Sequence, residues 1–195
     1  MPSDNAPNQN ATRLQLADEL LVVRCQLGEP AAFDELVEQW SGPILRYAGH
    51  VLGQDDRLAD VVQDIWLRVL RGLPHLREPA RFRAWIFGVA RRSLMDVMRQ
   101  RYAEPVSVDI DEANESSTIA GSDSPFDADL VIQMQHHLQL LPVHEREALD
   151  LFYIQELDQA QIAEILGVPV GTVKSRLFRA RKLLRRALAD SGEAP

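Results

Sequence analysis

Several features of secreted, membrane and zinc-binding proteins are missing from this sequence. A single cysteine, Cys25, excludes an internal disulfide framework and a cysteine-based zinc cluster. The longest apolar runs are only a few residues, far short of the roughly 20 that a membrane-spanning helix needs. Met1–Asn10 is polar and shows no secretory signal. We therefore expect a cytoplasmic protein that does not insert into a membrane, with Cys25 as a small buried residue.

The sequence also lacks long stretches in which polar and apolar residues alternate, so no part of it favours a β-sheet. Apolar residues recur instead at helical spacing from Pro30 to Leu52, with an expected break at Ser41–Pro43. Asp55 or Asp56 is a suitable cap for a following helix that Gly72 ends. Further helices are expected over residues 82–98, over Leu130–Leu141 and, three of them, from Pro142 onward. The sequence predicts an all-α protein.

The net charge of −8 conceals an uneven distribution along the chain. Residues 68–101 hold nine arginines against two acids, and residues 165–186 hold seven basic side chains and no acid. Residues 102–144 hold eight acids and neither lysine nor arginine. Because salt screens charges over about 8 Å in the cell, a ligand at the surface senses the local charge rather than the total. Two basic segments in an acidic chain therefore favour a nucleic-acid partner.

The acidic segment also marks a domain boundary. Residues 104–127 are rich in Ser, Asp, Glu, Asn, Ala and Pro and show little apolar periodicity, a composition typical of linkers. We predict two small helical domains joined by a flexible acidic linker. The expected divisions are a disordered tail at 1–12, a first domain at 13–102, the linker at 103–129, a second domain at 130–189 and a tail at 190–195.

The segment 158–173 has the residue types and spacing of a helix-turn-helix. Ala163 is small enough for two helix backbones to approach, and Gly167 is free to adopt the positive φ of the turn. An ordinary helical hairpin is the alternative. The helix predicted at Thr172–Arg186 has no acid to balance its positive charges, as expected of a helix that binds DNA. Lys174, Ser175, Phe178 and Arg179 are predicted to reach base edges, and Thr172, Arg176, Arg181 and Lys182 to contact phosphates.

The first basic segment differs because it mixes arginine with aromatic residues in Arg81–Phe87. Guanidinium groups beside aromatic rings suit binding to single-stranded nucleic acid, and the loop Leu73–Arg81 could hold a flipped base. Alternatively, Phe82 and Trp85 are core residues. The helix before this segment carries a polar stripe of Asp60, Gln63, Asp64 and Leu67, which is either a solvated face or a docking surface for a basic helix.

Over residues 20–101 and 130–188 the sequence resembles the bacterial sigma factors, specifically the compact extracytoplasmic-function (ECF) group of the sigma-70 family. The motifs that carry this resemblance are Asp60–Arg68, Phe82–Arg91, Leu141–Glu147 and Gly171–Arg181. The resemblance implies a subunit that gives core RNA polymerase its promoter specificity.

The resemblance also implies roles for particular residues. In that family the first domain docks on the β′ clamp helices, which maps onto Asp60, Gln63, Asp64 and Leu67, and the β subunit is a further expected contact. The same domain opens the promoter −10 element, and the helix-turn-helix reads the −35 element. The −10 candidates are Arg77, Arg81, Arg83, Arg91, Arg92 and Arg99. An anti-sigma factor that could hold the protein at the membrane is expected at family level.

Two other classes of function remain open at this stage. A DNA-processing enzyme such as a recombinase needs a nucleophile among clustered arginines or carboxylates, a setting that Asp60 and Asp64 lack. A plain repressor or activator would bind duplex DNA tightly without polymerase. We expect no catalytic residues, no cofactor, no metal and no small-molecule substrate.

Overall fold

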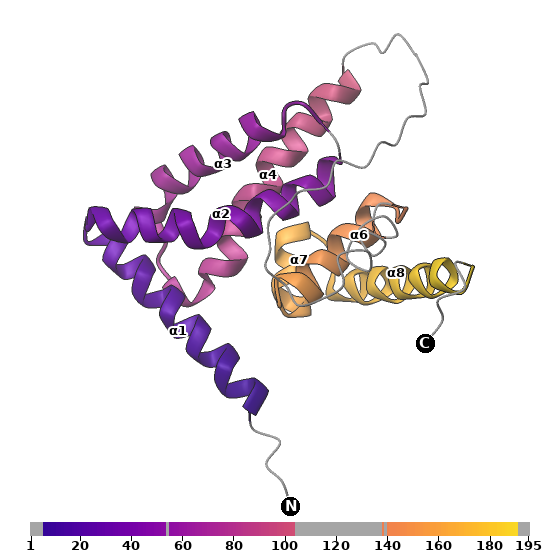
Figure 1. Cartoon of the computed structure of the whole chain (residues 1–195), viewed down its shortest axis with the longest axis horizontal. Helices are drawn as coiled ribbons and strands as arrows, with labels where there is room; N and C mark the ends of the chain where they lie inside the picture. Colours follow the sequence, from indigo (N-terminus) through magenta and orange to yellow (C-terminus); the bar gives the residue numbers. More distant parts are fainter. Residues whose placement is uncertain (1–5, 54, 104–137, 139, 191–195) are drawn as a thin grey trace, which may run out of the picture.

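A computed structural model of the chain describes residues 6–53, 55–103, 138 and 140–190, and their regular structure is entirely helical. The prediction of an all-α fold is therefore confirmed. Helices α1 to α4 form an N-terminal unit and α6 to α8 a C-terminal unit, with α1 reaching away from the rest (Figure 1). Within the described residues, no helix combines the length and the apolar character that crossing a membrane would require.

The first helix, α1 (Ala6–Gln26), begins within the segment 1–12 that the sequence predicted to be a disordered tail. A helix that is already nucleated extends at low cost, and Pro7 fits the first turn, where its missing N–H has no helical partner. Leu21 and Val22 anchor α1 in the core. Cys25, which we expected to be buried, is only half-buried, and burial raises the pKa of its thiol.

The second helix, α2 (Pro30–Leu52), runs straight through the break predicted at Ser41–Pro43. Proline inside a helix removes a backbone hydrogen bond and costs about 3 kcal/mol. Trp40, Ile44 and Tyr47 nevertheless lie buried on one side of α2, and burying each large apolar side chain contributes about 1.5–3 kcal/mol. Tertiary packing therefore outweighs the local helix breaker.

The next helix, α3 (Leu58–Gly72), ends where the sequence predicted. The N-cap residue of α3 is Arg57, not Asp55 or Asp56. The Asp55 carboxylate accepts the backbone N–H of Arg57 in the turn before the helix. Two short 3₁₀ turns, η1 (Leu73–His75) and η2 (Pro79–Arg81), then lead into α4 (Phe82–Ala103).

Aromatic rings fill the centre of the N-terminal unit. Trp40 meets Phe82 edge-on at 5.3 Å between ring centroids, and Tyr47 meets Phe87 in the same way at 5.3 Å. Phe82 is thus a core residue, as one of the two interpretations of the Arg/aromatic segment held. Trp85 is only half-buried and remains available at the surface.

The C-terminal unit contains α6 (Val143–Leu149), a π-helical turn η3 (Asp150–Ile154), α7 (Gln159–Leu166) and α8 (Val170–Asp190). The turn between α7 and α8 has the predicted chemistry, because Gly167 adopts φ 63°. At the other end of α7, Asp158 caps the helix by accepting the N–H groups of Ala160 and Gln161. The helix predicted at Leu130–Leu141 lies mostly outside the described residues, as do most of the linker and the C-terminal tail.

The two units pack against each other, α6 against α2 and α7 against α4. Figure 1 shows the C-terminal unit beside these two helices. The buried apolar residues form one cluster that continues from the N-terminal unit into the C-terminal unit through Leu151 and Ile162. The chain therefore adopts a closed arrangement of two units.

Candidate polymerase and nucleic-acid interface

The polar stripe predicted on α3 is a continuous exposed surface. Asp60, Gln63 and Leu67 are exposed, and Asp64 is half-exposed. Leu67 and Leu70 leave 46% and 50% of their surface in solvent, so an apolar edge runs beside the acids. The opposite side of α3 lies in the core, which fixes the orientation of this stripe.

The two acids of the stripe have different surroundings. The Asp64 carboxylate pairs with Arg68 at 2.8 Å and accepts the Ser93 hydroxyl at 3.0 Å, so it also joins α3 to α4. Asp60 has no hydrogen-bond or ion-pair partner among the described residues. Asp60 is consequently the carboxylate on this surface that is available to a basic partner.

The loop between α3 and α4 is held by α1, which the sequence did not reveal. The Gln26 amide donates to the backbone carbonyls of Leu73 and Leu76 at 2.9 and 2.8 Å. These bonds fix both ends of the first 3₁₀ turn. Gln26 lies 47 residues before Leu73, so no local pattern indicated the contact.

A cavity of about 250 Å³ opens beside this loop. It combines the aromatic face of Trp85 with three arginines, a lining that suits a base and its phosphates. The C-terminal unit closes one side of the cavity with Glu164 and Ile165 of α7. The three arginines are Arg77, Arg81 and Arg92.

The other −10 candidates lie elsewhere. Arg83 points inward, where its Nε donates to the buried Asp18 at 2.7 Å and its guanidinium lies 5.5 Å from the Trp40 ring centroid. Arg99 is exposed near the end of α4 and pairs with Asp96. The cavity therefore gathers only part of the predicted set.

Arg91 lies at the contact between the units. Its Nε is 2.9 Å from Oε1 of Glu147, a fully buried carboxylate of α6 that also accepts the Tyr47 hydroxyl at 2.9 Å. Burial, reinforced by the neighbouring Glu147 charge, raises the pKa of Tyr47 well above its usual range, so Tyr47 remains a donor. His50 pairs with the buried Asp150, and Arg81 pairs with Glu164.

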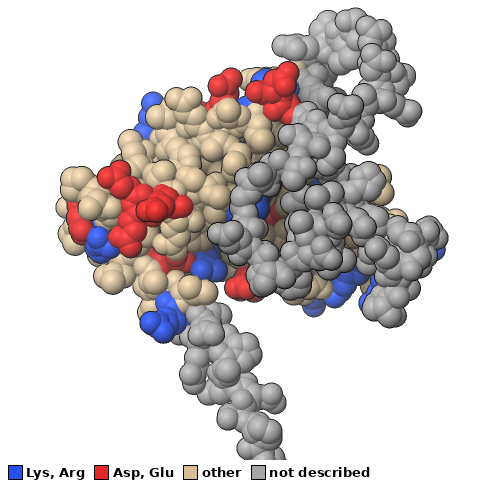
Figure 2. Space-filling model, in the orientation of Figure 1, with Lys and Arg blue, Asp and Glu red and all other residues tan. Residues whose placement is uncertain are grey.

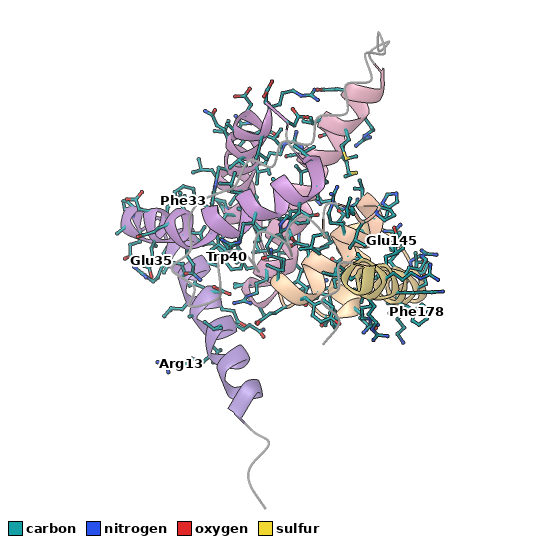
Figure 3. The ribbon with its side chains drawn as sticks, turned by 45° about the vertical axis from the view of Figure 1, so that its right-hand side comes forward. Arg13, Phe33, Glu35, Trp40, Glu145 and Phe178 are labelled. Atoms are coloured by element: carbon teal, nitrogen blue, oxygen red, sulfur yellow. The ribbon has the colours of Figure 1, made fainter. Side chains whose placement is uncertain are left out.

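The predicted recognition helix, α8, exposes the side chains expected to reach DNA bases. Phe178 leaves 65% of its surface in solvent and projects from α8 (Figure 3). Lys174 and Ser175 are also exposed, with the Ser175 hydroxyl donating to the Thr172 carbonyl at 2.9 Å. Arg179 is exposed but pairs with Glu145 of α6 at 2.9 Å.

The residues predicted to contact phosphates lie around this face. Arg181 and Lys182 are exposed, while Thr172 and Arg176 are half-buried. The Arg181 guanidinium donates to the Leu177 carbonyl at 3.2 Å and to the Tyr153 hydroxyl at 3.4 Å, so part of its donor capacity is used within the chain.

The charges of the surface are segregated. Figure 2 shows acidic side chains gathered at the end of the molecule where α1 meets α2. Exposed acids in that region include Glu29, Asp34, Glu35 and Glu38. The side chain of Arg24 pairs with both Glu29 and Glu35, at 2.7 Å each. In the part of the chain that the structure describes, no three His, Cys, Asp or Glu side chains are placed to hold a metal ion.

Gly72 sets the position of the Trp85 ring. A Cβ at Gly72 would lie 2.8 Å from Cζ2 of Trp85, so an alanine there displaces the ring from the cavity wall. An off-rotamer ring costs about 0.5–1.5 kcal/mol, and we expect the free energy of unfolding of Gly72→Ala to be lower than that of Gly42→Ala by about that amount. The measurement is chemical denaturation followed by tryptophan fluorescence. Gly42→Ala is the matched control, because its Cβ meets only the flexible end of Arg46 at 3.3 Å. Equal free energies of unfolding of the two variants would contradict the tight contact between residue 72 and the Trp85 ring.

Comparisons with known proteins match both units. The family model for sigma-70 region 2 covers residues 36–104, and the model for sigma-70 region 4 covers residues 132–184. The chain is 27% identical over 183 residues to the ECF RNA polymerase sigma-E factor of Haemophilus influenzae, a match that covers 89% of this chain and 96% of that protein.

Solved structures share the fold. The structure of CnrH in complex with the cytosolic domain of CnrY is similar with a TM-score of 0.62 and 27% identity, covering 90% of this chain and 98% of that one. The sigma factor RpoE in complex with the anti-sigma factor NepR from Bartonella quintana has a TM-score of 0.66 and 24% identity, covering 80% and 96%.

Proposed function

The chain belongs to the sigma-70 family, as an ECF sigma factor that serves transcription initiation, and we propose that it recruits core RNA polymerase to promoters through −10 and −35 contacts and promotes strand opening. The observation that carries the proposal is the presence, in one chain, of an arginine–tryptophan cavity on α4 and an exposed basic recognition helix, α8. The first suits single-stranded DNA and the second suits the major groove of a duplex.

Docking on polymerase uses the exposed surface of α3. Asp60 supplies an unpaired carboxylate, and Leu67 and Leu70 supply an apolar edge that a partner helix can cover. The partner is the β′ clamp helices of core polymerase, and the β subunit supplies a further contact. Gln63 lies between the acids on the same exposed side and completes the polar part of the surface.

The −10 element binds at the cavity. Strand opening exposes the faces of bases, and a base that leaves the stack can stack on Trp85 while nearby arginines hold its flanking phosphates. Gln26 keeps the loop at the cavity rim in place. Because Arg83 binds Asp18 inside the unit, its role is to support this surface rather than to contact DNA directly. Arg77, Arg81 and Arg92 are the cavity arginines, and Arg99 extends the basic surface along α4. Arg91, the remaining −10 candidate, is paired with Glu147 at the contact between the units.

The −35 element binds at α8. Lys174 and Arg179 have the donors that guanine edges accept, and Phe178 offers an apolar contact to a thymine methyl group. Thr172, Arg176, Arg181 and Lys182 contact the flanking phosphates and fix the orientation of the helix in the groove.

Regulation by an anti-sigma factor is the further partner that we propose. It is supported by the fold shared with RpoE, which was solved with the anti-sigma factor NepR. The protein acts in the cytoplasm, where an anti-sigma factor could hold it at the membrane.

Size-exclusion chromatography with purified core polymerase tests the proposed function. We expect the chain to co-elute with core polymerase. When a promoter fragment is added, we expect it to elute together with this complex, whereas at the same salt concentration it should elute separately from either component alone. A chain that binds duplex promoter DNA tightly by itself and elutes separately from core would be a repressor or activator instead.

A further inference from the structure

Helix α1 is apolar on two opposite faces. Leu21 and Val22 face the core and are almost fully buried. A second set of apolar side chains leaves between 39% and 81% of its surface in solvent, and we call this set the outer seam: Leu16, Leu20, Val23 and Leu27. With 3.6 residues per turn, the outer seam lies on the side of α1 that faces away from the core. A contiguous apolar stripe in solvent is typical of a surface that a partner covers.

The outer seam has the spacing at which two helices pack along each other. Its members are separated by four, three and four residues, which is the seven-residue pattern of a coiled-coil seam. The helical geometry continues to Leu27, whose backbone N–H donates to the Val23 carbonyl at 3.0 Å. Pro79 and Ala80 of η2 stand beside the seam and form one wall of a groove along it. A second helix therefore finds both a floor and a wall to pack against.

The spacing of the seam fits a second copy of this chain. A two-fold axis requires a surface that is complementary to itself. The separations of four, three and four residues read the same from either end. Two antiparallel copies of α1 therefore bring Leu16 opposite Leu27 of the second copy and Leu20 opposite Val23 of the second copy. In this register every residue of the outer seam meets an apolar side chain.

Charges at the two ends of the seam favour the antiparallel orientation. Arg13 is exposed and has no hydrogen-bond or ion-pair partner among the described residues. At the other end, the single charge of Arg24 is shared by Glu29 and Glu35. Figure 3 shows Arg13 on the outer half of α1 and Glu35 at the corner where α1 meets α2. Antiparallel copies place Arg13 beside Glu29 of the second copy, whereas parallel copies would bring two acidic corners together.

We propose that the chain forms an antiparallel dimer in solution through the outer seam of α1. Four seam residues a side are far fewer than the 20–30 of a standard interface, so we expect a dissociation constant on the order of 10 μM. The outer seam shares no residue with the docking surface of α3, with the cavity or with α8. The inference is therefore independent of the proposed function.

Sedimentation equilibrium of the full chain measures the dimer. Between about 1 and 200 μM, we expect the average mass to rise from that of one chain toward that of two. Leu20→Glu places a carboxylate at the centre of the seam, and we expect it to raise the dissociation constant at least about tenfold. Leu14→Glu is the matched control, because Leu14 is half-exposed on the same helix but lies seven residues before the buried Leu21, off the seam. Circular dichroism verifies that both variants remain folded.

Disulfide cross-linking under oxidising conditions tests the orientation, in a Cys25→Ser background that removes the natural thiol. We expect Leu16→Cys to cross-link with Leu27→Cys when the two variants are mixed, and neither variant to cross-link with itself. Self-cross-linking of either variant would show parallel copies and would overturn the inference. A chain that sediments as a monomer at every concentration would also overturn it, as would a dimer that Leu20→Glu and Leu14→Glu weaken equally.

Discussion

Asp60→Lys lowers the affinity of the chain for core polymerase by at least about 30-fold, because a like-charge contact at a protein interface costs several kcal/mol and 1.4 kcal/mol is a factor of ten. Asp60 is exposed on α3 and has no partner among the described residues, so the substitution breaks no contact within the chain that the structure shows. The measurement is a competition assay in which the variant displaces a fluorescent wild-type chain from core polymerase.

Asp56→Lys is the control for this substitution. Asp56 is exposed in the turn before α3 and undergoes the same change of charge, four residues before Asp60. We expect its affinity for core polymerase to fall clearly less than that of Asp60→Lys, because Asp56 lies in the turn before α3 and not on the helical stripe that Asp60 shares with Gln63 and Leu67. Asp64→Lys is less informative, because Asp64 also binds Arg68 and Ser93. Equal affinities of the Asp60 and Asp56 variants would show that α3 does not dock on polymerase.

Lys174→Glu reduces binding of the polymerase complex to a −35 element by about 100-fold. The substitution removes a base-edge contact worth about 1–3 kcal/mol and places a carboxylate against the negative potential of the groove. Lys174 is exposed in the first turns of α8, where a recognition helix contacts base edges. A filter-binding assay on promoter fragments with intact and scrambled −35 elements measures the effect.

Arg186→Glu makes the same change of charge near the other end of α8. Twelve residues separate the two positions, which is about 18 Å along a helix and about two screening lengths. The affinity of the Arg186→Glu complex for the promoter fragment should therefore fall about threefold at most, and its preference for the intact −35 element should remain. If both substitutions lower the affinity for intact and scrambled fragments equally, α8 supplies only general charge attraction and does not recognise the −35 sequence.

Local chemistry in the sequence predicted the helix-turn-helix well. Gly167 takes the predicted positive φ and Ala163 is buried where the helices meet, because both properties belong to single residues and their immediate neighbours. The continuation of α2 through Pro43 was not predictable in that way. It depends on the burial of Trp40 and Tyr47 against α4, a tertiary effect that exceeds the local cost of proline.

The same distinction holds for the candidate site. Periodicity predicted that Asp60 and Leu67 would be exposed together on one helix. Arg83 and Arg91 lie in the same arginine-rich segment as the cavity arginines, so the sequence does not distinguish them. Their carboxylate partners lie 65 and 56 residues away in the sequence. Only the packing of α1 and of the C-terminal unit shows which arginines have partners within the chain.

Run-off transcription with purified core polymerase tests the central claim most directly. With core and this chain together, we expect transcripts that begin at fixed positions downstream of two short sequence elements shared by the promoters used. Core alone should give none of these transcripts, and scrambling either element should abolish the corresponding product. Initiation that is the same with and without the chain would contradict its assignment as the promoter-specificity subunit.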